Sequence, residues 1–457
     1  MKRRTFVKQA FALTALPVFP VLNDQTSQHR MQNKISIIST NSNFEREKLL
    51  HPFGFKGGYL TELWQTVVGL SSTNNTATGI ATQSVLYGDA DFFSSHSEAA
   101  GNALMYALTD KALQLVKTTE FESPVKLMAK IQPELMQAAI NLTGKKDINK
   151  NFLLNALVAV DNAAWILYAA ENGYKDFDAM MPEPYKKPLS FRNKKVAVMF
   201  QVSYGMPLQD IVDAVNQGYF VIKIKTGQPG TQPEMLQKDI ERLTQIHTAL
   251  KDLRTPHTAN GKLIYTMDSN ARYEKKETLL KYIDHARKIG ALDQVLFIEE
   301  PLHEDNEASV ADVGVRIGAD ESVHDEASAL KRLKQGYGLL VLKGIAKTLS
   351  GSIPIAKLAY EHNVPCICAD LTVNPILIDW NKNLAARVAP FPGLGMGMIE
   401  TNGNMNYINW SKMVGYHPHN GALWTQVNNG VFELDDDFFN SSGGIFSASD
   451  HYRGLVD

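Results

Sequence analysis

The sequence predicts an α/β fold, in which a closed barrel of eight parallel strands follows a smaller α+β region. The first observation is a regular alternation of short apolar runs with amphipathic segments over residues 196–400, which is typical of alternating strands and helices in a parallel sheet. The second is that eight repeats fit into about 200 residues, which favours a barrel over an open sheet. The third is a different pattern before residue 178, a hairpin followed by helices.

The predicted strands of the barrel are the apolar runs 196–202, 220–226, 263–269, 295–301, 315–322, 338–344, 364–370 and 394–400. Helix candidates between them, with apolar residues at helical spacing, are 207–219, 277–292, 325–337 and 353–363. No glycine-rich phosphate-binding motif follows the first strand, so the pattern does not favour a dinucleotide-binding protein.

The N-terminal part has its own organisation. Residues 63–85 contain two β-rich runs around the polar turn SSTNNT, which predicts a hairpin, and residues 97–173 carry apolar positions at helical spacing. A stretch rich in proline and charge, 178–195, places the domain boundary. The predicted divisions are an export signal at 1–30, an α+β domain at 31–190, the barrel at 191–405, and a C-terminal segment at 406–457 that packs back on the first domain.

Composition indicates the class of partner. Hydrophobic residues make up 44% of the 457 residues, and the formal net charge is −2, so there is no basic field for nucleic acid. A small molecule is therefore the expected partner, and the chain is long enough for two domains. The only cysteines, Cys366 and Cys368, are two residues apart on a predicted strand and are predicted to be core thiols.

The N-terminus has the layout of a secretory signal. A basic segment, residues 2–8, precedes an apolar run at 10–22 that is too short to span a bilayer. Its RRTFVK stretch is similar to a twin-arginine export signal. We therefore predict an exported, periplasmic protein with no membrane contact after the signal is removed. A disordered basic arm is the alternative interpretation.

Polar residues end most of the predicted strands, where the active site of a parallel barrel lies. One such residue could be a surface residue or a helix cap, but a run of consecutive strands ending this way does not fit that interpretation. The residues, in strand order from the second to the eighth, are Lys223 and Lys225, Asp268 and Asn270, Glu299 and Glu300, Asp320 and Glu321, Lys343, Asp370, and Glu400 and Asn402.

These residue types predict a specific chemistry. Asp268, Glu299 and Asp320 follow successive strands and would repel one another without a cation between them. Oxygen ligands without histidine or cysteine favour Mg²⁺, with Mn²⁺ possible, over zinc. Lys225 and Lys343 flank the cluster and are expected to face each other, each with a lowered pKa that suits a general base. The pattern predicts removal of a proton from the carbon next to a carboxylate.

The motifs KIK, MDSN, IEEP, ADES and LVLK, in this order on successive strands, resemble the enolase superfamily and, within it, the muconate lactonizing enzyme subgroup. The resemblance covers most of the chain. It implies a (β/α)7β TIM-like barrel with an N-terminal α+β capping domain, and a lysine base acting with Mg²⁺ that stabilises an ene-diolate. The roles that it implies are a base at Lys225, a base on the opposite face at Lys343, enolate support from Lys223, and metal ligation by Asp268, Glu299 and Asp320.

The resemblance also implies residues that contact or support the substrate. Asn270 matches the second polar residue of a D-x-N element, and Glu321 is expected to hold a lysine in place. The stretch HPFGFKGGYLTE, residues 51–62, resembles the mobile loop that closes over the substrate, and it contains Lys56.

The eighth strand departs from one branch of the family. Dipeptide epimerases typically carry D-x-D there to hold the substrate ammonium, whereas this chain has Glu400 and Asn402 in IETN. Asp370 on the seventh strand could supply the missing carboxylate or could cap the following helix.

The predicted function is therefore an Mg²⁺-dependent epimerase or racemase of a dipeptide or amino-acid derivative, acting through an enolate and assembled as a homo-oligomer. One alternative is a lyase on the same scaffold, a sugar-acid dehydratase or cycloisomerase. Dehydratases more often use histidine, but His303 and His324 are predicted to be solvated loop residues. An exported, catalytically inactive binding protein is the alternative of another class, and a buried salt-bridge network without function is disfavoured because it would add little stability.

Overall fold

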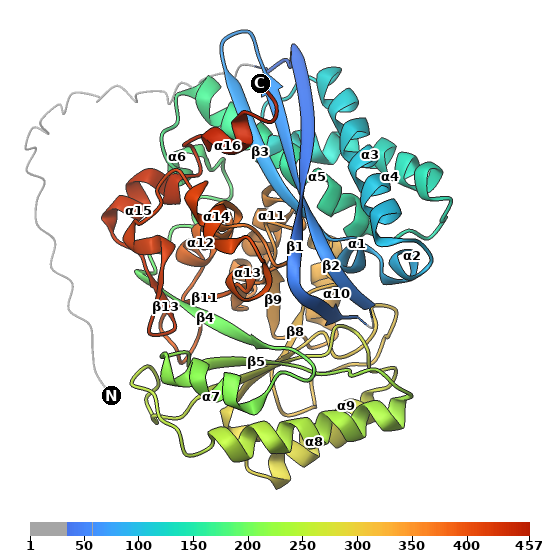
Figure 1. Ribbon diagram of the computed structural model, residues 1–457, viewed down its shortest axis with the longest axis vertical. Coiled ribbons are helices and arrows are strands. Elements are labelled where there is room, and N and C mark those ends of the chain that lie inside the picture. Colours follow the sequence, from blue (N-terminus) through green and yellow to red (C-terminus); the bar gives the residue numbers. More distant parts are fainter. Residues whose placement is uncertain (1–33, 57) are drawn as a thin grey trace, which may run out of the picture. The chain divides into compact units, whose positions relative to one another are not determined.

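Eight parallel strands form the barrel in the computed structural model, which describes residues 34–56 and 58–457; the predicted export signal lies outside these residues. Neighbouring strands pair in chain order, and β11 pairs back with β4, so the barrel closes (Figure 1). The strands are β4 Lys195–Val202, β5 Val221–Lys225, β6 Ile264–Asp268, β7 Val295–Glu299, β8 Ile317–Ala319, β9 Leu339–Leu342, β10 Cys366–Cys368 and β11 Gly397–Glu400. The predicted α/β barrel is confirmed.

Helices connect the strands at all but one of the crossovers. They are α7 Leu208–Asn216, α8 Gln232–Leu250, α9 Lys276–Lys288, α10 Glu326–Lys334, α11 Leu349–Glu361 and α12 Pro375–Arg387, with a 3-10 turn at Leu292–Gln294. Between β7 and β8, residues 300–316 form a loop without a helix, so this crossover departs from the implied (β/α)7β pattern. Arg332 holds the loop instead, because its guanidinium donates to the carbonyls of Glu304 and Asn306.

The capping domain is a three-stranded antiparallel sheet packed against helices (Figure 1). Its elements are β1 Ser39–Phe55, β2 Gly58–Ser71, β3 Thr76–Gln83, α1 Val85–Gly88, α2 Ala90–Ser94, α3 Glu98–Lys117, α4 Pro124–Thr143, α5 Lys150–Asn172 and α6 Phe177–Met180. The hairpin predicted around SSTNNT is β2 and β3. Strand β1 was not predicted, because its residues are mostly polar and half-exposed.

The expected loop at 51–62 is mostly strand. Phe53 pairs with Leu60 and Phe55 with Gly58, so only the tip of the β1–β2 hairpin turns. The loop was expected from the family resemblance, but pairing between β1 and β2 extends the ladder to the tip. The mobile loop implied by the resemblance is therefore a hairpin.

Helix α5 forms the centre of the capping domain. It is the one helix among the described residues that is long and apolar enough to cross a membrane, and 94% of its apolar stretch is buried inside the protein. Residues on every side of α5 are buried, as expected of a core helix. The two cysteines on β10 are free and buried, as predicted.

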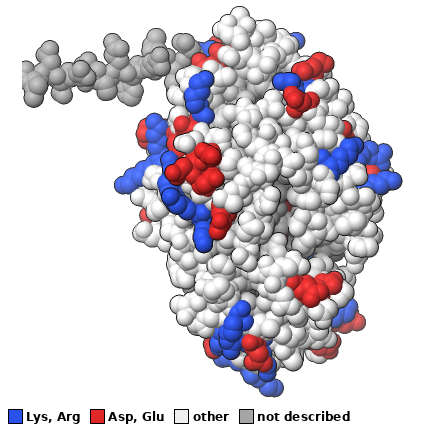
Figure 2. Space-filling model, turned by 60° about the vertical axis from the view of Figure 1, so that its left-hand side comes forward, with Lys and Arg blue, Asp and Glu red and all other residues white. Residues whose placement is uncertain are grey.

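The C-terminal segment contacts both the barrel and the capping sheet. Strand β13 pairs with β4, and the amide of Asn41 on β1 donates to the carbonyl of Val456 at 2.8 Å. The elements of the segment are α13 Gly403–Asn406, α14 Trp410–Gly415, β12 Val427–Asn428, β13 Val431–Glu433, α15 Asp436–Ser441 and α16 Asp450–Arg453, with 3-10 turns at Leu423–Thr425 and Ser442–Gly444. On the face in Figure 2, charged side chains of both signs lie in small mixed groups.

Candidate active site

Lys223 lies at the centre of a buried group of carboxylates. Its Nζ is 3.1 Å from Asp268 Oδ2, 3.0 Å from Glu299 Oε2 and 2.9 Å from Glu400 Oε2, and its side chain is 1% exposed. Burial alone would lower the pKa of Lys223, but the three carboxylates outweigh it and raise this pKa well above the usual value. Lys223 is therefore a permanent cation in the barrel.

Lys225 lies on the same face of β5, two residues nearer the C-terminal end of the strand. Its Nζ lies 2.5 Å from Asp268 Oδ2 and 3.2 Å from Asn270 Oδ1. Asn270 adopts a left-handed conformation (φ 46°), and its amide donates to Glu321 Oε1 at 2.9 Å. Glu321 thus accepts a hydrogen bond from Asn270, whose side-chain oxygen in turn lies next to Lys225, so Glu321 can position this lysine through Asn270.

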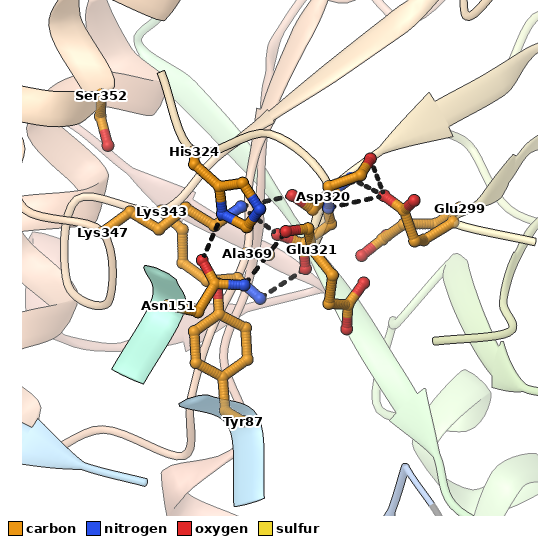
Figure 3. A network of polar contacts seen from close by, with 12 residues as sticks. Tyr87, Asn151, Glu299, Asp320, Glu321, His324, Lys343, Lys347, Ser352 and Ala369 are labelled. Atoms are coloured by element: carbon orange, nitrogen blue, oxygen red, sulfur yellow. Dashed lines mark hydrogen bonds and ion pairs between the residues drawn. The ribbon is translucent and has the colours of Figure 1, made fainter. Parts of the chain in front are cut away.

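A second pair of lysines lies on the other side of the barrel. Lys343 Nζ is 2.5 Å from Asp320 Oδ2, and Lys347 Nζ is 3.0 Å from Asp320 Oδ1 (Figure 3). Lys343 follows β9, which lies four strands from β5 in either direction around the closed barrel. Lys225 and Lys343 therefore approach the same pocket from opposite sides, and both line it.

The expected lowering of the lysine pKa is wrong for Lys343. Burial lowers the pKa of Lys343, but the charges of Asp320, Glu321 and Glu299 outweigh burial and raise it. The prediction failed because it counted the neighbouring cation and omitted the carboxylates, which lie on strands far apart in the sequence.

The three carboxylates proposed as metal ligands end adjacent strands β6, β7 and β8. Glu299 is fully buried, and both of its carboxylate oxygens lie about 3 Å from the ammonium group of Lys223. Burial and the neighbouring Asp268 charge raise the pKa of Glu299 well above its usual value. Burial would also raise the pKa of Asp268, but Lys223 and Lys225 lower it to about 2.

This donor set fits a hard divalent cation, since its members are buried carboxylates on neighbouring strands and all three offer oxygen atoms. As the side chains stand, no three acidic, histidine or cysteine side chains in the described part of the chain converge on one point. Each carboxylate is turned toward a lysine instead, so the lysines now neutralise the charge that an ion would neutralise.

Asp370, Glu400 and Asn402 form the wall next to Lys223. Asp370 accepts hydrogen bonds from the backbone N–H groups of Leu371, at 2.7 Å, and of Asn402, at 2.9 Å. The helix after Asp370 is capped by Asn374, so the interpretation of Asp370 as the cap of that helix is wrong. Burial and the nearby charge of Glu400 raise the pKa of Asp370 to about 7.

The capping domain covers this pocket. The tip of the β1–β2 hairpin contributes Phe53, Phe55 and Leu60, and Tyr87 comes from α1. The free volume is only about 30 Å³, room for one or two water molecules. A substrate therefore enters only when the hairpin or the lysine side chains move.

One expected substrate residue, Lys56, lies elsewhere, and other pocket residues were missed. Lys56 does not line this pocket but a neighbouring cleft of about 600 Å³, and its Nζ donates to the carbonyl of Tyr87 at 3.2 Å. Lys347 could have been noticed four residues after Lys343 in LKGIAK. Tyr87 and Gln201, which also line the pocket, carry no signal in the local sequence.

The two histidines considered for dehydratase chemistry differ in their surroundings. The side chain of His303 is 61% exposed, as expected of a solvated residue. His324 is not solvated: it bonds Asn151 of α5 and Glu304, each at 3.0 Å (Figure 3). The prediction for His324 is wrong because the capping domain covers this loop.

A family model described as "Enolase C-terminal domain-like" matches residues 208–396. This part of the chain belongs to that family. The match includes Lys225 and Lys343, which we call the outer lysines, and all three proposed metal ligands. The resemblance to the enolase superfamily is therefore confirmed.

Solved structures share the fold of the enolase-like chain at low identity. A mandelate racemase/muconate lactonizing protein from Herpetosiphon aurantiacus has a TM-score of 0.63 at 16% identity, covering 88% of this chain and 96% of that one. A dipeptide epimerase from Cytophaga hutchinsonii, complexed with Mg and the dipeptide D-Ala-L-Val, has 0.59 at 14%, covering 89% and 98%. An N-succinyl Arg/Lys racemase from Bacillus cereus has 0.57 at 13%, covering 82% and 89%. No functionally curated protein matches the sequence.

Proposed function

We propose that the enolase-like chain is an Mg²⁺-dependent epimerase or racemase, which inverts the α-carbon of a dipeptide or an N-acyl amino acid through an enolate. The observation that carries the proposal is the placement of Lys225 and Lys343 at the ends of opposite barrel strands, each 2.5 Å from a different buried carboxylate. Inversion needs a proton acceptor on one face of a carbon and a proton donor on the other. A dipeptide epimerase and an N-succinyl Arg/Lys racemase share the fold.

The side chains divide the work in this proposal. Asp268, Glu299 and Asp320 would hold Mg²⁺, whose charge when bound stabilises negative charge on the substrate carboxylate. Lys225 removes the α-proton on one face, and Lys343 returns a proton on the other. Lys223 keeps its charge beside Asp268 and Glu299, where it supports the enolate electrostatically.

The wall opposite the metal ligands suits a positively charged or amide group of the substrate. Glu400 and Asp370 are both buried there and line the pocket. Asn402 Oδ1 has no hydrogen-bond partner among the described residues, so it is free to accept from a substrate N–H. We propose that this wall binds the nitrogen-bearing end of the substrate. Asp370, Glu400 and Asn402 would then take the role that the D-x-D pair has in dipeptide epimerases.

We also propose that the protein is exported to the periplasm, on the basis of the basic segment and apolar run at residues 2–22. Cell fractionation of the full chain and of a variant with both Arg3 and Arg4 replaced by lysine checks this, since a twin-arginine pathway requires the pair.

Hydrogen exchange in deuterated water tests the proposed reaction. A panel of dipeptides and N-acyl amino acids is incubated with the enzyme and Mg²⁺, and deuterium at the α-carbon is followed by NMR. We expect exchange from both enantiomers with the native chain. In Lys225→Met, exchange of one enantiomer is lost and that of the other, initiated by Lys343, remains; Lys343→Met gives the reverse.

Lys130→Met, on the exposed face of α4, is the matched control and should behave as the native chain. The proposal is wrong if no member of the panel exchanges, and the assignment of faces is wrong if either active-site variant loses exchange from both enantiomers. Loss of water from a substrate without inversion would select a lyase instead.

A further inference from the structure

Tyr87 brings an aromatic ring from the capping domain onto one of the two outer lysines. It lies in α1 and is 1% exposed. Lys343 Nζ lies 4.4 Å from the centre of the ring, within the range of a cation–π contact. Figure 3 shows the ring below the group formed by Lys343 and Asp320. The capping domain thus contacts the predicted base directly, and not only the substrate.

The hydroxyl of Tyr87 has no hydrogen-bond partner among the described residues, although it is buried. Buried hydroxyl groups nearly always have one, so an unpartnered donor that lines a pocket points to a ligand. The pocket is the one that contains both outer lysines.

The charges around Tyr87 decide what its hydroxyl can do. Burial, and then the charges of Asp320, Glu321, Glu300 and Glu299, raise the pKa of Tyr87 well above 10. The phenol therefore stays protonated and can donate a hydrogen bond. In the part of the chain that the structure describes, the amines of Lys343 and Lys56 lie over the ring, and the hydroxyl is hydrogen-bonded to neither of them.

We propose that Tyr87 is a residue of the reaction centre with two tasks: its ring holds the Lys343 amine in place, and its hydroxyl donates a hydrogen bond to the anionic carboxylate of the bound substrate. The second task rests on the proposed function. A carboxylate substrate that enters a pocket lined by Asp320, Glu321 and Asp370 meets negative charge, and a fixed neutral donor offsets part of that repulsion without adding a titrating group.

The first test uses the free protein and therefore does not depend on the proposed reaction. In protein labelled with [ε-¹³C]lysine, the signal of Lys343, assigned with Lys343→Met, should show an upfield shift caused by the ring. Tyr87→Phe keeps the ring and should keep the shift, whereas Tyr87→Leu should lose it. An unchanged shift in Tyr87→Leu would overturn the contact between ring and amine.

The second test uses exchange with the substrate found in the panel. Tyr87→Phe should raise KM by about 10- to 100-fold with little change in kcat, since it removes one hydrogen bond to a charged group. Tyr87→Leu should in addition slow the exchange initiated by Lys343, by about tenfold, and leave the exchange initiated by Lys225 unchanged.

Tyr174→Phe is the control, because its hydroxyl lies outside the pocket. Equal loss of exchange on both faces in Tyr87→Leu, or an unchanged KM in Tyr87→Phe, would overturn the respective task. If the native chain exchanges no substrate, both the proposed reaction and the proposed task of the hydroxyl are wrong. The task of the ring is then still decided by the NMR test.

Discussion

Two lysines on one face of a buried strand are stable in this protein because buried carboxylates surround them, and one of these carboxylates, Asp268, pairs with both. Lys223 has Asp268, Glu299 and Glu400 around it, and Lys225 has Asp268. Removing one member of such a buried group leaves uncompensated charge, which costs far more than the group contributes as a whole. Lys223 matters most for charge balance, since it pairs with carboxylates on three other strands.

Lys223→Met should therefore lower the free energy of unfolding by about 3–5 kcal/mol in the absence of divalent metal. Added Mg²⁺ should recover part of the loss, because a cation held by Asp268, Glu299 and Asp320 replaces the missing charge. Urea unfolding with EDTA and with Mg²⁺ measures both. The exposed Lys130→Met should show neither effect, and a Lys223→Met variant as stable as the native chain in EDTA would contradict the charge balance inferred from the structure.

At the scale of elements, α5 of the capping domain locks onto the first turn of α11 of the barrel. Asp161 of α5 accepts hydrogen bonds from the backbone N–H of Ser350 at 3.0 Å and from its hydroxyl at 2.5 Å. The indole of Trp165, one helical turn on, donates to the same hydroxyl. A carboxylate at the beginning of a helix is favourable to the helix dipole, but this one is fully buried.

Burial raises the pKa of Asp161 from 3.8 to about 6, despite its hydrogen bonds to Ser350. The folded protein therefore binds the proton more tightly than the unfolded chain. The stability that protonation contributes is complete below pH 4 and is lost as the pH rises through about 6. At 1.36 kcal/mol per pH unit, the loss is about 3 kcal/mol.

Asp161→Asn should remove this dependence. The free energy of unfolding of the native chain, measured relative to that of the variant in urea, should fall by about 3 kcal/mol between pH 4 and pH 7. Comparison with the variant cancels the titration of all other groups. Asp147→Asn, which alters an exposed capping-domain carboxylate, should leave the slope in place, and a difference independent of pH would show that Asp161 is not protonated in the folded state.

For the molecule as a whole, one buried tyrosine joins three distant parts of the chain. Tyr407, in the C-terminal segment, donates to the carbonyl of Thr372 at 2.5 Å and accepts from the side chain of Gln65 at 2.9 Å. Gln65 in turn accepts from Asn374, at the beginning of α12. The capping sheet, the barrel and the C-terminal segment are thus held in one network of hydrogen bonds.

Tyr407→Phe should lower the free energy of unfolding by about 1–3 kcal/mol, because the buried amide of Gln65 and the carbonyl of Thr372 lose their partner. Urea unfolding followed by tryptophan fluorescence measures it. Tyr174→Phe is the control and should change stability little. A loss no larger than that of the control would mean that water replaces the hydroxyl and that the network does not couple the three parts.

The barrel and the positions of its polar residues could be predicted because both are local properties. Strand ends follow from apolar runs, and the polar residues at or just after these ends, such as Asp268 and Lys343, lie at one end of any parallel barrel. The predictions that failed concern surroundings supplied by other parts of the chain. His324 is covered by α5, and β1 is a strand only because β2 pairs with it.

The sequence alone determined the closed α/β barrel, the capping region and the order of lysines and carboxylates around the pocket. It could do so because periodicity and spacing depend only on residues that are close together in the chain. The tertiary structure decides which carboxylate neutralises which lysine, that the pKa of Lys343 is raised rather than lowered, and that Tyr87 lies over its amine. These depend on distances between side chains that only the folded chain brings together, and burial makes each of those distances count because little water is present to screen the charges.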